Sequence, residues 1–264
     1  MNEVNRTLFI PLYGKAQVSR KQIILRDPWA EEIWEKESFS IRGKAGSRWL
    51  AYYMTMRAKV FDTWAGVMIR RHRDAVVLHI GCGLDSRCLR VERPRAGWID
   101  GDLPDVIAQR RKYFQEEENY RMVVLDAARP GNLAQLPDGP AAVVLLEGVS
   151  MYLTNQELEA FLRALRDKYP RVYLLMDVYT EFAARVSRYK NPVNQVGVTT
   201  LYGVDAMEKL AAAAGLRVKG GCSMTPGHLV DQLPAAERAF FGAVMAGGLA
   251  RKLYRLYALE SRRG

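Results

Sequence analysis

Residues 76–91, VVLHIGCGLDSRCLRV, join a block of apolar, β-branched residues to a pair of glycines and then to a charged segment. A short apolar run followed by closely spaced glycines predicts a buried strand that ends in a tight loop and leads into a helix. In open α/β sheets such loops lie at the carboxyl ends of the strands, where ligands bind. The stretch therefore predicts a ligand-binding loop and raises the question of which ligand it holds.

Apolar, strand-like runs alternate along the chain with amphipathic, helix-like segments. The runs expected to form strands are 75–80, 97–100, 121–126, 141–147 and 171–178, with a further one near 216–222. This alternation predicts an α/β fold with a mostly parallel sheet covered by helices on both faces. Residues 251–260, RKLYRLYALE, fit either a helix or a final strand. We favour a strand that pairs antiparallel with 216–222 and forms an antiparallel C-terminal edge of the sheet.

The first seventy residues differ from the rest of the chain. They carry helical patterns and many aromatic residues but no strand-like run. We expect residues 1–70 to form an N-terminal helical cap over the sheet and residues 71–264 to form the cofactor-binding domain, the two making a single compact unit. The aromatic residues of the cap are expected to lie in its core, except that Tyr52 and Tyr53 can also contact a ligand.

The glycine loop narrows the choice of cofactor. The nicotinamide fingerprint G-x-G-x-x-G needs a third glycine, and this chain has Gly81 and Gly83 but Ser86 at the third position. Asp85 inside the loop would repel a pyrophosphate. S-adenosylmethionine has no phosphate and carries a sulfonium, an ammonium and a carboxylate. The loop therefore favours S-adenosylmethionine over NAD.

Acidic residues follow the next three apolar runs. Asp100 and Asp102 stand at the end of the second strand, about 20 residues past the glycines, where an acid accepts hydrogen bonds from ribose hydroxyls. Asp126 ends the third strand, where it can hold an adenine amino group, and Glu147 ends the fourth. A carboxylate after an apolar strand is costly to bury unless it is paired or faces a pocket. Together these acids predict a cofactor site along the carboxyl edge of the sheet.

Composition and charge exclude several classes of protein. The three cysteines fit neither a disulfide framework nor a zinc site, and the three histidines have no metal-ligand spacing. We therefore expect no metal and a cytoplasmic location. The sequence shows no signal peptide and no apolar run long enough to span a bilayer. The net charge of +10 suits nucleic acid, an anionic membrane, an acidic substrate or a solvated basic face, but no RNA-binding module is visible, so we expect neither nucleic acid nor membrane as a partner.

Several motifs occur in the order typical of one enzyme family. They are TLFIPLYGKAQVSRK, LRDPWA, MTMR, HIGCGLDSR, DGDLPDVIAQRRK, LDAAR and LEGVSMYLT, between residues 7 and 155. In these motifs the sequence resembles the leucine carboxyl methyltransferase superfamily and is most similar to its tetracenomycin-type polyketide carboxyl O-methyltransferases. The resemblance implies a class I methyltransferase with a Rossmann-like sheet and S-adenosyl-L-methionine as cofactor.

The resemblance also implies roles for individual residues. Arg57 and Lys15 would pair with the carboxylate of the cofactor, and Glu147 would face its ammonium. Gly81, with Gly83 and Asp85 of its loop, would lie against the methionine part. Asp102 would bind the ribose hydroxyls, Asp126 and Ala127 would hold the adenine, and Tyr152 would line the methyl-transfer pocket. His79 stands where the family usually has an asparagine or an acid. It is expected either to contact the cofactor or to bond only to the backbone.

The expected reaction is methyl transfer to an oxygen of a small acceptor, most simply a carboxylate of an aromatic or polyketide-type natural product. A carboxylate is ionised at neutral pH, whereas a phenol has a pKa of about 10 and calls for a general base. The candidate acceptor contacts are Tyr152, Tyr179, Arg185, Arg188, Lys190 and His228. Tyr152 and His228 are the candidate catalytic residues, with His228 as the base if the acceptor is a phenol. Methylation of a protein C-terminal carboxyl or of nucleic acid is a less expected alternative, and the oligomeric state stays open.

Overall fold

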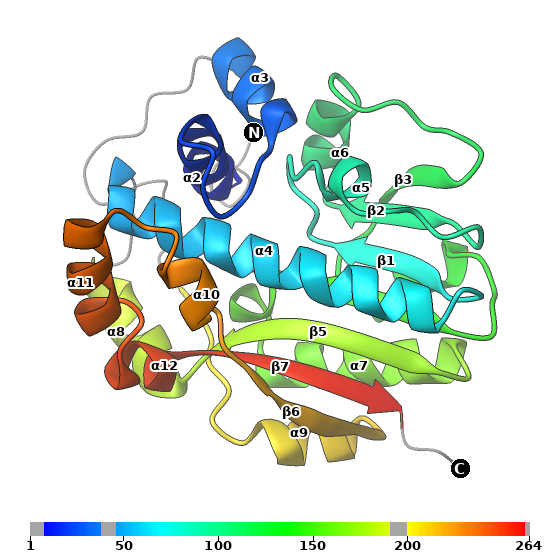
Figure 1. Cartoon of the computed structure of the whole chain (residues 1–264). Helices are drawn as coiled ribbons and strands as arrows, with labels where there is room; N and C mark the ends of the chain where they lie inside the picture. The colour runs from blue at the N-terminus through cyan, green and yellow to red at the C-terminus, as the bar shows by residue number, and fades with distance from the viewer. Residues whose placement is uncertain (1–7, 38–45, 191–199, 262–264) are drawn as a thin grey trace.

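A computed structural model describes residues 8–37, 46–190 and 200–261, except the side chains of 188–190, 249 and 251. Seven strands form one sheet of order β3-β2-β1-β4-β5-β7-β6 (Figure 1). The strands are β1 (Val76–Ile80), β2 (Trp98–Asp102), β3 (Tyr120–Val124), β4 (Ala142–Leu146), β5 (Val172–Tyr179), β6 (Leu216–Cys222) and β7 (Tyr254–Ser261). The first five run parallel, and β7 is antiparallel to both β5 and β6. The predicted α/β class with an antiparallel C-terminal edge is confirmed.

The final strand lies between two earlier ones. β7 pairs with β6, as predicted, but it also pairs along its length with β5, so that β6 forms the edge. The segment 251–260 combines both of its expected structures, because its first three residues end helix α12 (Gly248–Leu253) and the rest belong to β7. The junction places Tyr254, the first residue of β7, opposite Tyr179, the last residue of β5.

Helices cover both faces of the sheet (Figure 1). The helices are α2 (Phe9–Arg20), α3 (Pro28–Glu37), α4 (Arg48–Arg71), α5 (Arg87–Arg90), α6 (Pro104–Arg110), α7 (Asn155–Lys168), α8 (Glu181–Lys190), α9 (Met207–Ala213), α10 (Gly227–Val230), α11 (Ala235–Val244) and α12, with 3₁₀ turns η2 (Pro130–Gln135) and η3 (Ser150–Tyr152). Successive strand residues point to opposite faces. Val77 accordingly packs in a cluster with Phe61 of α4, and Leu78 in a second cluster with Phe161 of α7.

The N-terminal part of the chain forms a helical layer over one face. Within the described ranges 8–37 and 46–74, the regular elements are helices, as the sequence predicted. Helix α4 crosses the sheet, α2 lies against its N-terminal part, and α3 packs on α2 (Figure 1). The Ser47 hydroxyl caps α4 by accepting a hydrogen bond from the Trp49 backbone nitrogen at 3.3 Å. This layer carries Lys15 on α2 and Arg57 on α4 towards the carboxyl ends of the strands.

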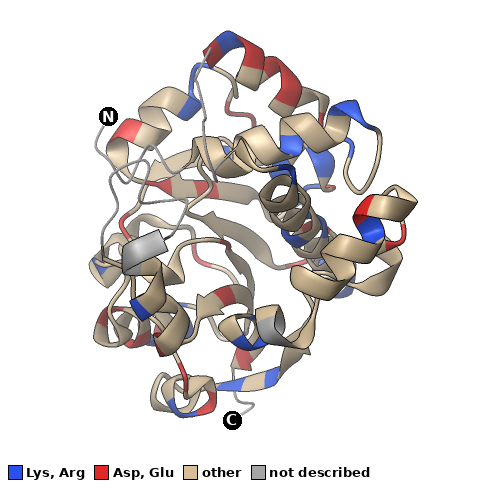
Figure 2. Cartoon of the chain, turned by 90° about the vertical axis from the view of Figure 1, so that its left-hand side faces the viewer, with Lys and Arg blue, Asp and Glu red and all other residues tan. Residues whose placement is uncertain are grey.

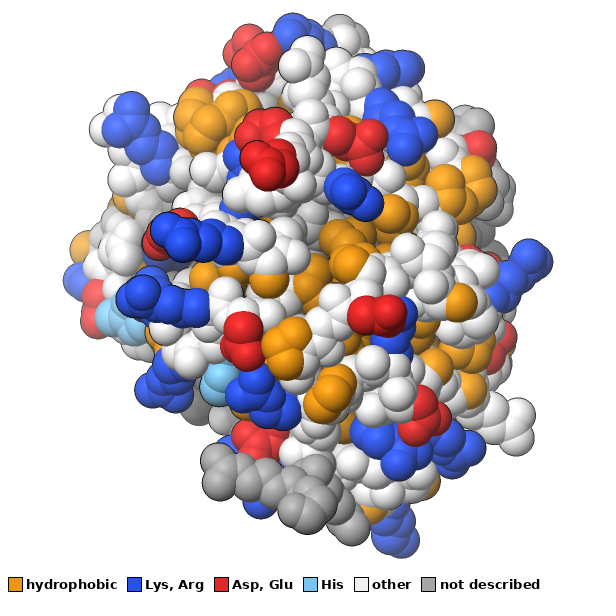
Figure 3. Space-filling model, turned by 90° about the vertical axis from the view of Figure 1, so that its right-hand side faces the viewer, with side chains coloured by type: hydrophobic (Ala, Val, Ile, Leu, Met, Phe, Trp, Pro, Cys, Tyr) orange, Lys and Arg blue, Asp and Glu red, His pale blue; other side chains and the backbone are white. Residues whose placement is uncertain are grey.

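Charged residues are interspersed over the surface. Figure 2 shows the side towards which the parallel strands run, and Figure 3 shows the opposite side. In both views Lys and Arg alternate with Asp and Glu, and in Figure 3 apolar side chains lie between them. The two views therefore show the excess of basic residues spread out rather than gathered in one band. Among the residues that the structure describes, no helix has both the length and the apolar character needed to cross a bilayer.

Candidate cofactor and acceptor site

A cavity of about 550 Å³ lies between the carboxyl ends of the parallel strands and the helices α2 and α4. Ten of the residues expected to contact the cofactor line it, as do two of those expected near the acceptor: Lys15, Arg57, His79, Gly81, Gly83, Asp85, Asp102, Asp126, Ala127 and Glu147, with Tyr152 and Tyr179. The carboxyl ends of adjacent parallel strands meet at one edge of a sheet, which brings together residues that are far apart in the sequence. The roles of these residues towards a ligand remain predictions.

Two glycines keep the floor of the cavity open. Gly81 has a φ of 70°, in the left-handed region that favours glycine, and a Cβ there would lie 2.1 Å from Val149 Cγ2. Gly148 also has a φ of 70°, and a Cβ there would lie 3.4 Å from Arg57 Nη2. The two positions form a cradle in which a ligand can approach the backbone closely.

Asp102 is held in place where β2 ends. Its Oδ2 accepts a hydrogen bond from the Gly83 backbone nitrogen at 2.7 Å, and its Oδ1 accepts one from the Leu103 nitrogen at 2.8 Å. Burial raises the pKa of the Asp102 carboxyl, and the two backbone hydrogen bonds oppose that rise. Carboxylate oxygens have about four acceptor sites in total, so two bonds leave capacity for ribose hydroxyls.

Asp100 does not reach the cavity. It is the middle residue of β2 and is fully buried. Trp98 Nε1 donates a hydrogen bond to it at 2.8 Å, and the Arg110 guanidinium and the Tyr120 hydroxyl also donate to it. Burial opposes ionisation of Asp100, but Arg110 beside it holds the pKa of its carboxyl below the ordinary range. The expectation that Asp100 shares the ribose contact is therefore wrong, because helix α6 and the strand β3 cover it.

Asp126 and Ala127 lie at the rim of the cavity after β3. Asp126 Oδ1 accepts a hydrogen bond from the Ala128 nitrogen at 3.0 Å, and its Oδ2 lies 3.5 Å from Arg129 Nε. Ala127 is buried beside it. The turn thus holds one carboxylate and a small side chain at the edge of the cavity, which suits the flat adenine ring expected there.

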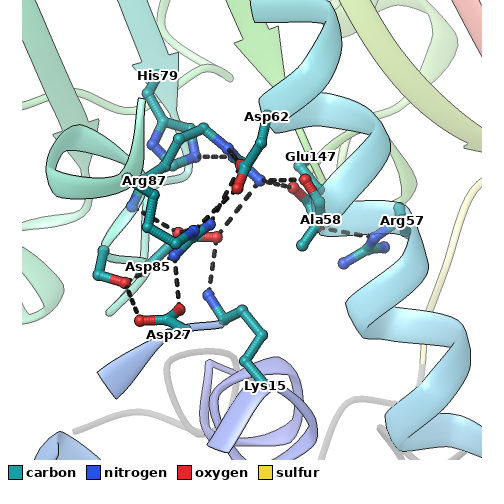
Figure 4. Close-up of polar contacts among 12 residues, drawn as sticks. Lys15, Asp27, Arg57, Ala58, Asp62, His79, Asp85, Arg87 and Glu147 are labelled. Atoms are coloured by element: carbon teal, nitrogen blue, oxygen red, sulfur yellow. Dashed lines mark hydrogen bonds and ion pairs between the residues drawn. The ribbon is translucent and has the colours of Figure 1, made fainter. Parts of the chain in front are cut away.

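Arg57 and Glu147 form a buried charged centre (Figure 4). Arg57 Nε donates to Glu147 Oε1 at 2.9 Å, and Nη1 donates to Asp177 Oδ2 at 2.8 Å and to the Tyr254 hydroxyl. Its Nη2 makes no hydrogen bond within the described part of the chain and lies beside Gly148 at the cavity. This nitrogen is in position to bind a carboxylate, as expected for Arg57.

Lys15 reaches the same loop from α2. Its Nζ lies 2.8 Å from Asp85 Oδ2. Burial opposes ionisation of Asp85, but Arg87, Arg90 and Lys15 hold the pKa of its carboxyl well below the ordinary range. An ammonium group has three donors, so Lys15 can bind a ligand carboxylate while it keeps Asp85.

Three residues at the site were not anticipated from the sequence. Arg87 and Asp177 are fully buried, and Tyr254 lines the cavity. The sequence contains a pattern that could have pointed to two of them. Arg87 follows the glycine loop directly, and Asp177 is the single acid in the apolar run of 171–178. No such pattern points to Tyr254, because its place depends on the pairing of β7 with β5.

His79 is bonded to side chains rather than to the backbone. Its Nε2 lies 2.9 Å from Arg87 Nη1, and its Nδ1 lies 3.2 Å from Asp100 Oδ1. A guanidinium has no acceptor, so the contact requires Nε2 to accept and places the imidazole proton on Nδ1. The interpretation of His79 as a strand-end residue bonded only to backbone is therefore wrong.

Aromatic and apolar side chains also line the cavity. The rings of Tyr179 and Tyr254 meet edge to face with centroids 4.5 Å apart, and Tyr152 is a further aromatic residue of the lining. The apolar residues of the lining include Leu8, Ile10, Pro11, Leu12, Leu50, Met54, Met151, Val186 and Leu201. Such a lining suits the apolar or aromatic body of an acceptor.

Two other residues expected near the acceptor, His228 and Arg185, do not line the cavity. His228 is exposed on the short helix α10, whose buried side is occupied by Leu229. Arg185 is exposed on α8 outside the lining. The side chains of Arg188 and Lys190 lie outside the described residues, although their backbone belongs to α8.

The two tyrosines of uncertain role are packing residues in this structure. The Tyr53 hydroxyl lies 3.2 Å from Met224 Sδ, and its ring stacks on that of Tyr254 with centroids 6.2 Å apart. The Tyr52 hydroxyl donates to Glu237 and accepts from Lys21 Nζ at 2.7 Å. Neither lines the cavity, but Tyr53 packs against Tyr254, which does.

The donor set fits S-adenosylmethionine. The lining offers a guanidinium nitrogen and an ammonium for a carboxylate, acids for an ammonium and a ribose, and a glycine cradle for close approach. Within the described ranges, no three His, Cys, Asp or Glu side chains are grouped to hold a metal. A parallel sheet with this site at its carboxyl edge defines a class I S-adenosylmethionine-dependent methyltransferase.

The comparison with known proteins identifies the family. The chain matches the leucine carboxyl methyltransferase family over residues 12–166 and belongs to that family. It is 31% identical over 238 residues to the tetracenomycin polyketide synthesis O-methyltransferase TcmP of Streptomyces glaucescens, an alignment that covers 89% of this chain and 88% of that protein. The protein is therefore an S-adenosylmethionine-dependent O-methyltransferase.

Two further similarities agree with this assignment. The S-adenosyl-L-methionine-dependent methyltransferase dpfgK of Gibberella zeae is 27% identical over 180 residues, which cover 62% of this chain and 60% of that protein. The crystal structure of magnesium protoporphyrin IX methyltransferase (ChlM) from Synechocystis PCC 6803 with bound SAH aligns with a TM-score of 0.52 and 11% identity, covering 88% of this chain and 94% of that one. At this identity the structural likeness supports the fold alone.

Replacing Asp102 with alanine is expected to weaken binding of S-adenosylhomocysteine about ten- to a hundredfold. The change removes a charged acceptor for the ribose and leaves the Gly83 nitrogen without its partner, at about 1.5–3 kcal/mol. Calorimetric titration measures the loss. The exposed Asp105, three residues along and outside the cavity, is the matched control, and Asp105→Ala should bind as wild type does. Equal affinities for Asp102→Ala and wild type would contradict the ribose assignment.

Proposed function

We propose that the protein transfers the methyl group of S-adenosylmethionine to a carboxylate oxygen of a small aromatic or polyketide-type acid. The similarity to a tetracenomycin O-methyltransferase supports a small natural product as the acceptor. The apolar and aromatic lining around Tyr152 and Tyr179 supports a flat, apolar body for that acceptor. We place the reaction in the cytoplasm, since Cys82, Cys88 and Cys222 are all free thiols.

The observation that carries the carboxylate assignment is the set of titratable groups around the cavity. A phenol must lose a proton, whereas a carboxylate needs no base. The histidine of the described lining, His79, is engaged by Arg87. Burial raises the pKa of the Tyr254 hydroxyl well above the ordinary range, which keeps this phenol protonated and makes it a donor rather than a base.

The side chains of this protein would act by binding, orientation and exclusion of water. Bound S-adenosylmethionine supplies a methyl group made electrophilic by its sulfonium. Arg57 and Glu147 are joined by a hydrogen bond of 2.9 Å and would fix the charged groups of the cofactor in the cavity. Leu12, Met151 and Leu201 also line the cavity and exclude water from it. Holding the acceptor oxygen in line, about 3 Å from the methyl carbon, converts a bimolecular encounter into a unimolecular step.

The maximal rate on an aromatic acid is expected to be nearly constant from about pH 6 to about pH 9. An ordinary carboxyl group is ionised throughout that range. Burial opposes ionisation of Asp85 and Glu147, but the neighbouring arginines hold the pKa of each below its ordinary value, so both also stay charged. The measurement is a pH–rate profile at saturating cofactor and acceptor, with methyl transfer shown to limit the rate.

His228→Ala is the informative variant for this profile. Because His228 is exposed outside the cavity, the variant should keep the flat profile and the wild-type rate. A rate that rises through an ionisation in wild type and collapses in His228→Ala would instead establish a phenolic acceptor with His228 as its base.

A further inference from the structure

Arg87 connects three elements beneath the cavity (Figure 4). Its side chain is fully buried, its Nε donates to Asp62 Oδ1 at 2.6 Å, and its Nη2 donates to Glu147 Oε2 at 2.6 Å. Its Nη1 bonds to His79 Nε2 at 2.9 Å. Helix α4, strand β1 and the turn after β4 therefore all fix one guanidinium group, which does not itself line the cavity.

The two oxygens of Glu147 are held by two different guanidinium groups. Arg57 binds Oε1 and Arg87 binds Oε2. Burial opposes ionisation of Glu147, but Arg87 and Arg57 together hold the pKa of its carboxyl below the ordinary range. The carboxylate is thus both charged and fixed in direction, and its remaining lone pairs are available at the cavity that it lines.

The network around Arg87 contains more carboxylates than cations. Four cations and five carboxylates are joined by ion pairs of 2.6 to 3.5 Å: Lys15, Arg57, Arg87 and Arg90 with Asp27, Asp62, Asp85, Glu147 and Asp177. When all are ionised, one negative charge is left without a partner in a water-poor environment. Burial raises the pKa of the Asp177 carboxyl, so Asp177 is the carboxylate of this network on which that excess weighs most. A buried charge of this kind favours a cationic ligand group.

We propose that Arg87 is a positioning residue that holds the Glu147 carboxylate ready to receive the ammonium group of the cofactor. Asp62 and His79 orient the guanidinium, and the guanidinium orients Glu147. The inference rests on the cofactor and not on the identity of the acceptor, so it stands or fails separately from the carboxylate assignment.

The test compares two ligands that differ in the amino-acid part. S-adenosylhomocysteine carries the ammonium, and 5′-methylthioadenosine lacks the amino-acid part. Dissociation constants for both are measured by calorimetry in wild type, Glu147→Gln and Asp62→Asn/Arg87→Gln. The double variant removes both partners of the Arg87–Asp62 ion pair, so that neither partner is left as an unpaired buried charge. Both variants should lose about ten- to a hundredfold in affinity for S-adenosylhomocysteine and keep their affinity for 5′-methylthioadenosine.

A single substitution separates positioning from general damage to the network. Asp27 pairs with Arg90 at 2.6 Å, and among the described residues no hydrogen bond joins it to Arg87 or Glu147. Asp27→Asn should therefore lower the unfolding temperature but keep the wild-type ratio of the affinity for S-adenosylhomocysteine to that for 5′-methylthioadenosine. Three outcomes would overturn the proposal. The ratio of the affinity for S-adenosylhomocysteine to that for 5′-methylthioadenosine could change in this control or stay unchanged in Glu147→Gln. Alternatively, Asp62→Asn/Arg87→Gln could lose equal affinity for both ligands.

A milder variant serves if Asp62→Asn/Arg87→Gln does not fold. Asp62 lies outside the lining of the cofactor cavity, and among the described residues its side chain pairs with Arg87 and Arg90. Asp62→Ala removes one anchor of the guanidinium, so any selective effect has to travel through the arginines. We expect the affinity for S-adenosylhomocysteine to fall threefold or more, and the affinity for 5′-methylthioadenosine to stay unchanged. This loss is on the order of half the free energy of one charged hydrogen bond. A loss shared equally by 5′-methylthioadenosine, or no loss, would overturn the proposal.

Discussion

Gly81→Ala is expected to abolish measurable binding of S-adenosylhomocysteine and to destabilise the fold by roughly 2–5 kcal/mol. The added Cβ would lie 2.1 Å from Val149 Cγ2, and the backbone φ of 70° is unfavourable for any L side chain. Either the loop after β1 or the turn that carries Val149 has to move. Both line the cofactor cavity, so the change damages binding as well as stability.

Gly83→Ala provides the matched control for this change. Gly83 also has a positive φ, of 53°, but a Cβ there would meet nothing closer than Leu8 Cβ at 3.6 Å, an ordinary contact. We expect only the backbone cost, about 1–2 kcal/mol. Calorimetry and urea unfolding measure both effects. Equal losses in the two variants would show that the close contact with Val149 is unimportant.

Asp177→Ala is expected to cost about 3–5 kcal/mol of unfolding free energy, because it breaks a buried ion pair and leaves three donors without their acceptor. Asp177 is fully buried and binds Arg57 Nη1 at 2.8 Å, the Tyr254 hydroxyl, and the Gly148 nitrogen at 2.8 Å. These three contacts join β5, β7, α4 and the turn after β4. Cofactor affinity should fall as well, since Arg57 and Gly148 both line the cavity.

An exposed ion pair serves as the control for the effect of burial on the unfolding free energy. Asp74 pairs with Arg171 at 2.7 Å, but both side chains are about half exposed. Exposed pairs contribute little to stability, so Asp74→Ala should unfold almost as wild type does. Urea unfolding of both variants makes the comparison. A cost for Asp177→Ala no larger than that of Asp74→Ala would contradict the assigned role of the buried pair.

The sheet could be predicted because its strands carry a local signal. The apolar run around Val77 and Leu78 is buried on both faces, and such runs are typical of central parallel strands. The glycine loop and the acids Asp102, Asp126 and Glu147 could be placed for the same reason, since a strand end fixes where the next residues lie. These features depend on short stretches of sequence.

The pairing of the charged side chains could not be predicted in this way. Arg87 bonds to Asp62 and to Glu147, which are 25 and 60 residues away, and no local pattern links the three. Asp100 and Asp102 look alike in the sequence, yet Asp100 is covered by Arg110 while Asp102 reaches the rim. Partner choice in a buried network depends on packing between distant elements, which periodicity does not encode.

The position of β7 has a consequence for synthesis of the chain. Within the described residues it is the last strand made, yet it pairs with β5 on one side and β6 on the other. Until it emerges from the ribosome, β5 has an unpaired outer edge, which is open to contact with other chains. The nascent protein at that stage already has the glycine loop and the strand-end acids but lacks the wall that Tyr254 supplies. We therefore expect full stabilisation by bound cofactor only after this strand has paired.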